Sequence, residues 1–195
     1  PSLEERYQYI ELGAATYLGD PNLNPEVGSF VDLGLRVWKS KLSFSGNVFA
    51  NYLNNLVIDE WRNDALYVKN NVGKARLWGG DASLEYKFNR TISTYATIAY
   101  VRGEDTAQNL DLPEMPPLNG RLGVHFPMLK FFDVNLYASF AAEQSKVAAG
   151  EISTPGYANY NIFLMTHPLR FASQSSRLIL GIENITDTAY RNHLS

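Results

Sequence analysis

Apolar and polar residues alternate along residues 78–88. The apolar positions hold Trp78, Ala82, Leu84, Tyr86 and Phe88, and the positions between them hold Asp81, Ser83, Glu85 and Lys87. Successive side chains of an extended chain point to opposite faces, so this pattern predicts a strand with one apolar and one polar face. A helix is not consistent with it, because apolar residues three and four apart do not line up and β-branched residues are frequent nearby.

The alternation resumes after a short break at Asn89-Arg90. Ile92, Ala96, Ile98 and Tyr100 share one face, and Ser93, Thr97 and Ala99 share the other. Two alternating runs joined by so short a polar break predict a β-hairpin.

The same pattern recurs along most of the chain. It is found in residues 30–38, 42–52 (with a bulged continuation to 58), 118–128, 132–140, 158–164 and 178–182. Together these runs predict an all-β fold, an antiparallel up-and-down meander of about eight strands. Residues 1–29 are expected to be irregular with a short helical turn within 3–9, and residues 59–70 to be a loop or a strand extension.

The predicted connections alternate in length. They are short after Trp38, Phe88 and Met128 and long after Ile58, Arg102 and Ala142, and residues 167–176 form a turn of medium length. Long loops at one end of every hairpin and short turns at the other are typical of a transmembrane β-barrel.

Composition narrows the functional classes. The 195 residues are 45% hydrophobic and only 19% charged, which is low for a soluble surface. The net charge of −3 and the absence of a basic stripe argue against a nucleic-acid partner. The absence of cysteine excludes disulfides, thiolate metal sites and cysteine nucleophiles. No apolar run approaches the roughly 20 residues of a transmembrane helix.

The polar face suits a crowded lumen more than a solvated surface, because its residues are small and mixed. The apolar face has aromatic residues toward both ends, as an interfacial girdle would. Trp38, Phe88, Phe126 and Phe132 lie near the short turns, and Tyr52, Trp78, Tyr100, Phe140 and Tyr160 lie near the long loops. This arrangement favours an apolar face turned toward lipid, and lipid requires a closed barrel.

Five motifs in order resemble the C-terminal part of the barrel of TonB-dependent outer-membrane receptors. Residues 17–26 (YLGDPNLNPE) resemble the family segment GNPNLKPE, with Asp20 in place of the usual Asn. Pro1 to Tyr7 resembles the segment that follows the preceding family box. The others are residues 71–79 (NVGKARLWG), 112–117 (LPEMPP) and 180–187 (LGIENITD) with Tyr190, where Ile185-Thr186 replaces Leu-Phe.

The resemblance implies a bacterial outer-membrane location and one domain over 1–195, a partial barrel. Residues 1–29 would be an extracellular loop, 30–186 strands and loops, and 187–195 the start of the last extracellular loop. Family barrels have about 22 strands around a plug, so this chain would supply roughly strands 14 to 21. The start at Pro1 also suggests a fragment, without plug, early strands or closing strand. The long loops would be extracellular and the short turns periplasmic.

The resemblance further implies the function of an active transporter for a scarce nutrient, such as an iron–siderophore or cobalamin. The implied partners are outer-membrane lipid, a metal–chelate ligand and a TonB-type energising protein that acts through the plug; no cofactor is implied. Aromatic and charged residues of the loops are the candidate ligand-binding residues: Tyr9, Trp61, Arg62, Tyr67, Glu104, Asp105 and Met115.

Metal binding and catalysis have little support. His125, His167 and His193 have no shared metal-ligand spacing, and no catalytic motif is present, so no metal site and no enzyme are predicted. Residues 2–20 contain no histidine, which argues against a haem ligand in this segment. Two alternatives remain. One is a soluble or surface β-barrel binding module with the apolar face as its core, and the other is an outer-membrane barrel enzyme such as a lipase.

Overall fold

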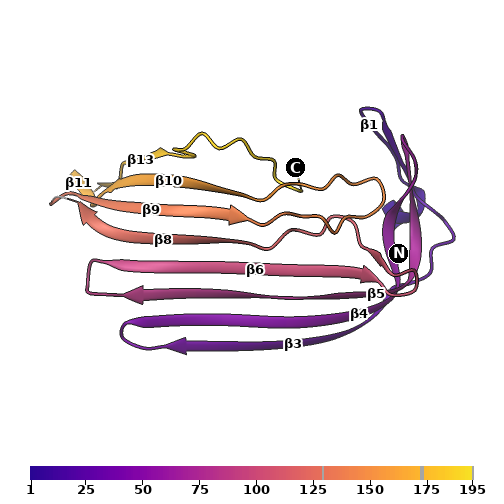
Figure 1. Cartoon of the computed structure of the whole chain (residues 1–195), viewed down its shortest axis with the longest axis horizontal. Coiled ribbons are helices and arrows are strands. Elements are labelled where there is room, and N and C mark those ends of the chain that lie inside the picture. Colours follow the sequence, from indigo (N-terminus) through magenta and orange to yellow (C-terminus); the bar gives the residue numbers. More distant parts are fainter. Residues whose placement is uncertain (129, 172–173, 195) are drawn as a thin grey trace.

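One large open β-sheet makes up most of the molecule. The computed structural model describes residues 1–128, 130–171 and 174–194. Eight strands lie side by side in chain order, each antiparallel to the next (Figure 1). We call them the main sheet: β3 (Val27–Trp38), β4 (Leu42–Asn63), β5 (Leu66–Lys87), β6 (Ser93–Asp105), β8 (Asn119–Met128), β9 (Phe132–Ala141), β10 (Tyr157–Thr166) and β13 (Ile179–Ile182). The predicted all-β meander is therefore confirmed.

Short elements accompany the main sheet. They are α1 (Leu3–Tyr7), β1 (Tyr9–Leu12), β2 (Ala15–Leu18), β7 (Leu110–Asp111), β11 (Leu169–Phe171) and β12 (Gln174–Ser176). Helix α1 begins with a capping box, in which Ser2 and Glu5 exchange side-chain to backbone hydrogen bonds. The segment 1–29, expected to be irregular, thus also contains the β1–β2 hairpin and the start of β3. Residues 59–70 are a strand extension around a tight tip.

Strand register confirms the two faces. Leu84 pairs with Ala96, Ala96 with Leu122, and Leu122 with Ala138, so these side chains share the apolar face. Leu122 is 57% exposed and Leu84 is 40% exposed. The apolar face is therefore an outer surface of this sheet, and it does not fold into a closed, dry core. Val134 is the exception, since it is buried beside its register partners Phe126 and Leu164.

Trp38 lies on the polar face, and its assignment to the apolar girdle was wrong. Val37 pairs with Phe44, which pairs with Leu84, so Val37 is the residue that faces the apolar side. Trp38 is one position further along and pairs with Ser43, whose next partner is Glu85. Strict alternation therefore turns the indole to the polar side, where it is 72% exposed.

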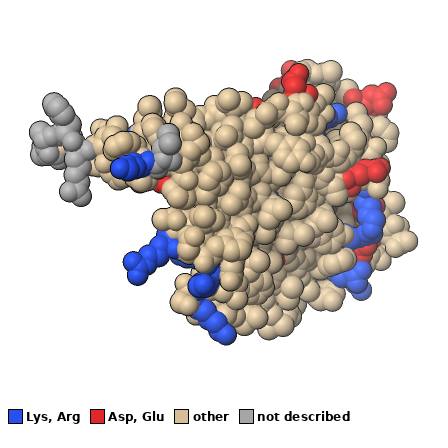
Figure 2. Space-filling view, turned by 60° about the vertical axis from the view of Figure 1, so that its left-hand side comes forward, with Lys and Arg blue, Asp and Glu red and all other residues tan. Residues whose placement is uncertain are grey.

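Charged side chains lie mainly at the two ends of the strands. Figure 2 shows a broad uncharged surface, with Lys and Arg gathered on the side of the short turns and both signs of charge on the opposite side. Within the described ranges, no helix is long and apolar enough to cross a membrane.

The two faces can be distinguished by site-directed spin labelling. The chain has no cysteine, so single Cys substitutions give unique labels. We expect labels at Leu84, Leu122 and Leu180 to be reached by lipid-soluble oxygen in membranes. Labels at Ser83, Thr97 and Ser139, on the polar face, should show much lower oxygen accessibility. Protection of the first set from both lipid-soluble and water-soluble quenchers would instead mean a buried core.

Candidate functional site

The long-loop end of the sheet is built around one hairpin that extends beyond its neighbours. Strands β4 and β5 have 22 residues each, about twice the length needed to span a membrane as a strand. Their distal halves bend away from the main sheet at the right of Figure 1, where the β1–β2 hairpin joins them. Strand β2 pairs with β5 in parallel, with Tyr17 opposite Tyr67.

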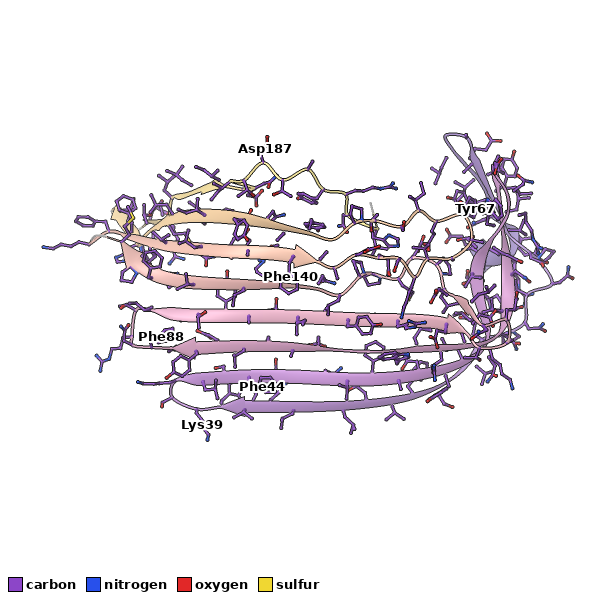
Figure 3. The ribbon with its side chains drawn as sticks, in the orientation of Figure 1. Lys39, Phe44, Tyr67, Phe88, Phe140 and Asp187 are labelled. Carbon is purple, nitrogen blue, oxygen red and sulfur yellow. The ribbon has the colours of Figure 1, made fainter. Side chains whose placement is uncertain are left out.

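Two tyrosines join the hairpins at this end. The rings of Tyr17 and Tyr67 are stacked, with centroids 4.9 Å apart and planes 9° from parallel. Burial raises the pKa of the Tyr17 phenol above its ordinary value. Figure 3 shows Tyr67 at the end of the molecule opposite Lys39 and Phe88.

Charged pairs stabilise the extension. Lys69 forms an ion pair of 2.7 Å with Asp59, its register partner across the hairpin. Glu60 accepts a hydrogen bond of 2.6 Å from the Asn70 amide and forms an ion pair of 2.8 Å with Arg62. Neighbouring opposite charges on paired strands add to the stability of this two-stranded ribbon.

The extension also meets the loop between β9 and β10. Gly150 has φ +90°, and a methyl group added there would lie 3.0 Å from Cδ1 of Trp61, so the indole packs directly against this loop. The loop is held to residues 112–117 as well. The Gln144 amide donates to the carbonyl of Met115 over 2.6 Å, and a Glu151 carboxylate oxygen accepts from the backbone N–H of Glu114. Three separate loops therefore form one connected surface.

A second charged group lies on the apolar side, just beyond the aromatic pair Trp78 and Tyr100. Glu104 accepts hydrogen bonds of 2.6 Å from both Arg76 and Arg102. The hydrogen bond from Arg76 is the largest cause that holds the pKa of the Glu104 carboxyl below its usual range. Arg102 also lies 3.4 Å from Asp111, so the loop after β6 is anchored to the sheet by ionic contacts.

Comparison with known proteins identifies the family. The model of the family described as "TonB dependent receptor-like, beta-barrel" matches residues 1–185. The chain belongs to this family. Its sheet is therefore part of the barrel of a TonB-dependent receptor, and its location is the bacterial outer membrane. No curated protein sequence matches the chain.

Solved structures share the fold at low sequence identity. The copper transporter OprC superposes with a TM-score of 0.81 at 20% identity over 91% of this chain. The unliganded ferric citrate transporter FecA superposes with a TM-score of 0.71 at 23% identity over 87% of this chain. The iron transporter FrpB from Neisseria meningitidis superposes with a TM-score of 0.68 at 12% identity over 92% of this chain. The matched region is 29%, 28% and 30% of those chains, so this receptor chain spans less than a third of their length.

The candidate ligand residues of this receptor barrel fall into two groups. Trp61, Arg62 and Tyr67 lie together on the β4–β5 extension, and Tyr9 lies on the neighbouring hairpin, where its hydroxyl donates to Glu11 over 2.6 Å. The remaining candidates are engaged in the fold itself. Glu104 is held by the two arginines, Asp105 is 3% exposed, and Met115 packs on Val72, Ala75 and Leu112.

Several residues of this surface were not among the sequence candidates: Asp59, Lys69, Tyr17, Arg76 and Arg102. Tyr17 depends on a parallel pairing that no local pattern indicates. The sequence could have indicated the two arginines. If the alternation is extended beyond Trp78 and Tyr100, it places Arg76, Arg102 and Glu104 on one face.

The polar face of the receptor barrel has its own interactions. The guanidinium of Arg121 lies 4.5 Å above the ring of Tyr137, which stacks on Phe163. The Tyr95 hydroxyl donates to Asn135 over 3.1 Å, and Asp133 lies 3.2 Å from a ring nitrogen of His167. In the part of the chain that the structure describes, no three His, Asp or Glu side chains form a group that could hold a metal ion.

Replacement of Glu104 tests the ionic anchor. Glu104→Gln should raise hydrogen exchange of backbone amides 103–112 about fivefold at pH 7, the effect of losing about 1 kcal/mol of ion-pair stabilisation. Because the folded pKa of Glu104 is lowered, its contribution is complete above the unfolded pKa of about 4.3 and is lost as pH falls through the folded value. The difference between wild type and variant should therefore vanish in acid. Glu143→Gln, which removes an exposed charge from the β9–β10 loop, is the control and should leave exchange of amides 103–112 unchanged both at pH 7 and in acid.

Proposed function

We propose that this chain forms part of the barrel wall of an outer-membrane active transporter, which takes up a scarce nutrient as a metal complex. The candidate ligands are an iron–siderophore, a cobalamin or a similar metal chelate, and the energy comes through an inner-membrane partner of the TonB type. An enzymatic role is not part of the proposal. Its main support is the family match together with an apolar face that crosses the strands of the main sheet.

The open sheet supports a larger barrel. Within the described residues, β3 pairs only with β4 and β13 pairs only with β10. Hydrocarbon cannot satisfy the free N–H and C=O groups at such edges, so both strands need further neighbours in the membrane. Further strands of a receptor barrel would supply them, as the coverage of under a third of the solved structures suggests.

The long-loop surface supports ligand capture. Aromatic side chains and charges of both signs lie together on the β4–β5 extension, and the extension contacts the loop between β9 and β10 through Trp61. Such a surface combines apolar contact area with polar groups that orient a bulky, polar ligand. The named neighbours transport copper, ferric citrate and iron, which makes metal complexes the first ligands to test.

Uptake assays test the proposal. The receptor that contains this chain would be expressed in cells lacking their own iron and cobalamin receptors. Radiolabelled iron–siderophores, ferric citrate, copper complexes and cobalamin would then be supplied one at a time. We expect accumulation of at least one, and its loss when the energising protein is deleted. Purification of the chain as a compact, detergent-free monomer would instead support a soluble binding module.

Two aromatic substitutions test the ligand surface. In that receptor, Trp61→Ala and Tyr67→Ala should each raise the Kd for the transported complex about tenfold, the typical effect of removing an aromatic anchor. Binding would be measured on intact cells at equilibrium. Trp38→Ala, at the opposite end of the sheet, is the matched control and should leave the Kd unchanged. Equal Kd values in all three variants would exclude the extension from ligand contact.

A further inference from the structure

The connections at the short-turn end of the main sheet contain basic residues and no acidic ones. Residues 39–41 contain Lys39 and Lys41, residues 88–92 contain Arg90, residues 130–131 contain Lys130, and residues 174–178 contain Arg177. These turns follow one another along a single end of the sheet, at the left of Figure 1. We call this set of turns the basic edge.

The side chains of the basic edge are exposed and uncompensated. Lys39, Lys41, Arg90, Lys130 and Arg177 are all exposed, and none forms an ion pair with another described residue. At the long-loop end, Arg62, Lys69, Arg76 and Arg102 each have an acidic partner, whereas the exposed Lys74 and Lys146 form no ion pair with another described residue. The basic edge differs in that its connections contain only positive charge, and Figure 2 shows Lys and Arg gathered on that side.

Exposed apolar side chains adjoin the basic edge. Phe88 is 55% exposed, Met128 45%, Phe131 64% and Leu178 53%. The ring of Phe88 meets that of Tyr86 edge to face, with centroids 5.0 Å apart. Aromatic rings at the end of an apolar band, followed directly by Lys and Arg, are characteristic of the level of lipid headgroups.

We propose that the basic edge binds anionic phospholipid headgroups, of the phosphatidylglycerol type, in the leaflet at the short-turn end. The inference rests on the membrane placement in the proposed function. The arrangement favours lipid over an acidic protein, because the charges are spread in a row across four hairpins beside the apolar band, whereas a protein partner would favour a compact patch. Each Lys or Arg near an anionic membrane surface strengthens binding by about fivefold.

Lipid selectivity of the reconstituted receptor tests this proposal. Spin-labelled phosphatidylglycerol and phosphatidylcholine would be compared by electron paramagnetic resonance in vesicles of phosphatidylcholine that contain the receptor. We expect the wild type to prefer phosphatidylglycerol several-fold. The triple variant Lys39→Gln, Lys41→Gln, Lys130→Gln should lose most of this preference, by up to about fivefold per charge removed at a site.

A matched control separates position from net charge. Lys74→Gln, Lys146→Gln, Arg191→Gln removes three exposed positive charges away from the basic edge and should keep the preference. In the wild type, raising the salt concentration from 0.05 M to 0.5 M should weaken the preference, a result that needs no variant to fold. Equal binding of the two lipids by the wild type, or equal loss in both triple variants, would overturn the proposal.

The uptake assay distinguishes this inference from the function on which it rests. Equal binding of the two lipids by a wild-type receptor that takes up its nutrient would refute only the lipid site. A preference for phosphatidylglycerol in a wild-type receptor that takes up none of the tested nutrients would refute the transport proposal and leave the lipid site standing.

Discussion

Backbone hydrogen bonding in a medium without water is the constraint on which the structure depends. A strand that crosses hydrocarbon must satisfy every N–H and C=O group through its neighbours, because lipid offers no partner. The main sheet meets this requirement from β4 to β10 with an unbroken antiparallel series of pairs. Because the backbone groups are already paired, the two faces of the sheet can have side chains of different polarity. One face is apolar from Leu33 to Leu180, and the other contains Asp32, Glu85, Arg121 and Asp133.

Sequence alone predicted the main sheet because its pattern is local. The alternation of Leu84 with Ser83 and Glu85 is a direct consequence of the pleat, so each strand could be recognised without knowledge of its neighbours. The lengths of the connections then indicated which ends lie together. The same reasoning placed Trp38 wrongly, because its aromatic character was weighed above its position in the alternation.

The long-loop surface was less predictable because its contacts are distant in sequence. The β1–β2 hairpin consists of two runs too short to show a period, separated by Gly13 with φ +61°. The parallel pairing that brings Tyr17 to Tyr67 has no counterpart in a meander. Residues such as Asp105 and Met115 looked like free loop residues. Burial of Asp105 under the turn that it caps, and of Met115 against Leu112, depends on loop conformation.

The parallel β2–β5 pair has a consequence for how the chain folds. Neighbouring strands of the main sheet are consecutive along the chain, so they can assemble progressively. The contact between Tyr17 and Tyr67 must close a loop that contains all of β3 and β4, at a cost in chain entropy that grows with its length. It becomes favourable once β4 and β5 have paired. By this argument the β1–β2 hairpin docks on a β4–β5 hairpin that has already formed.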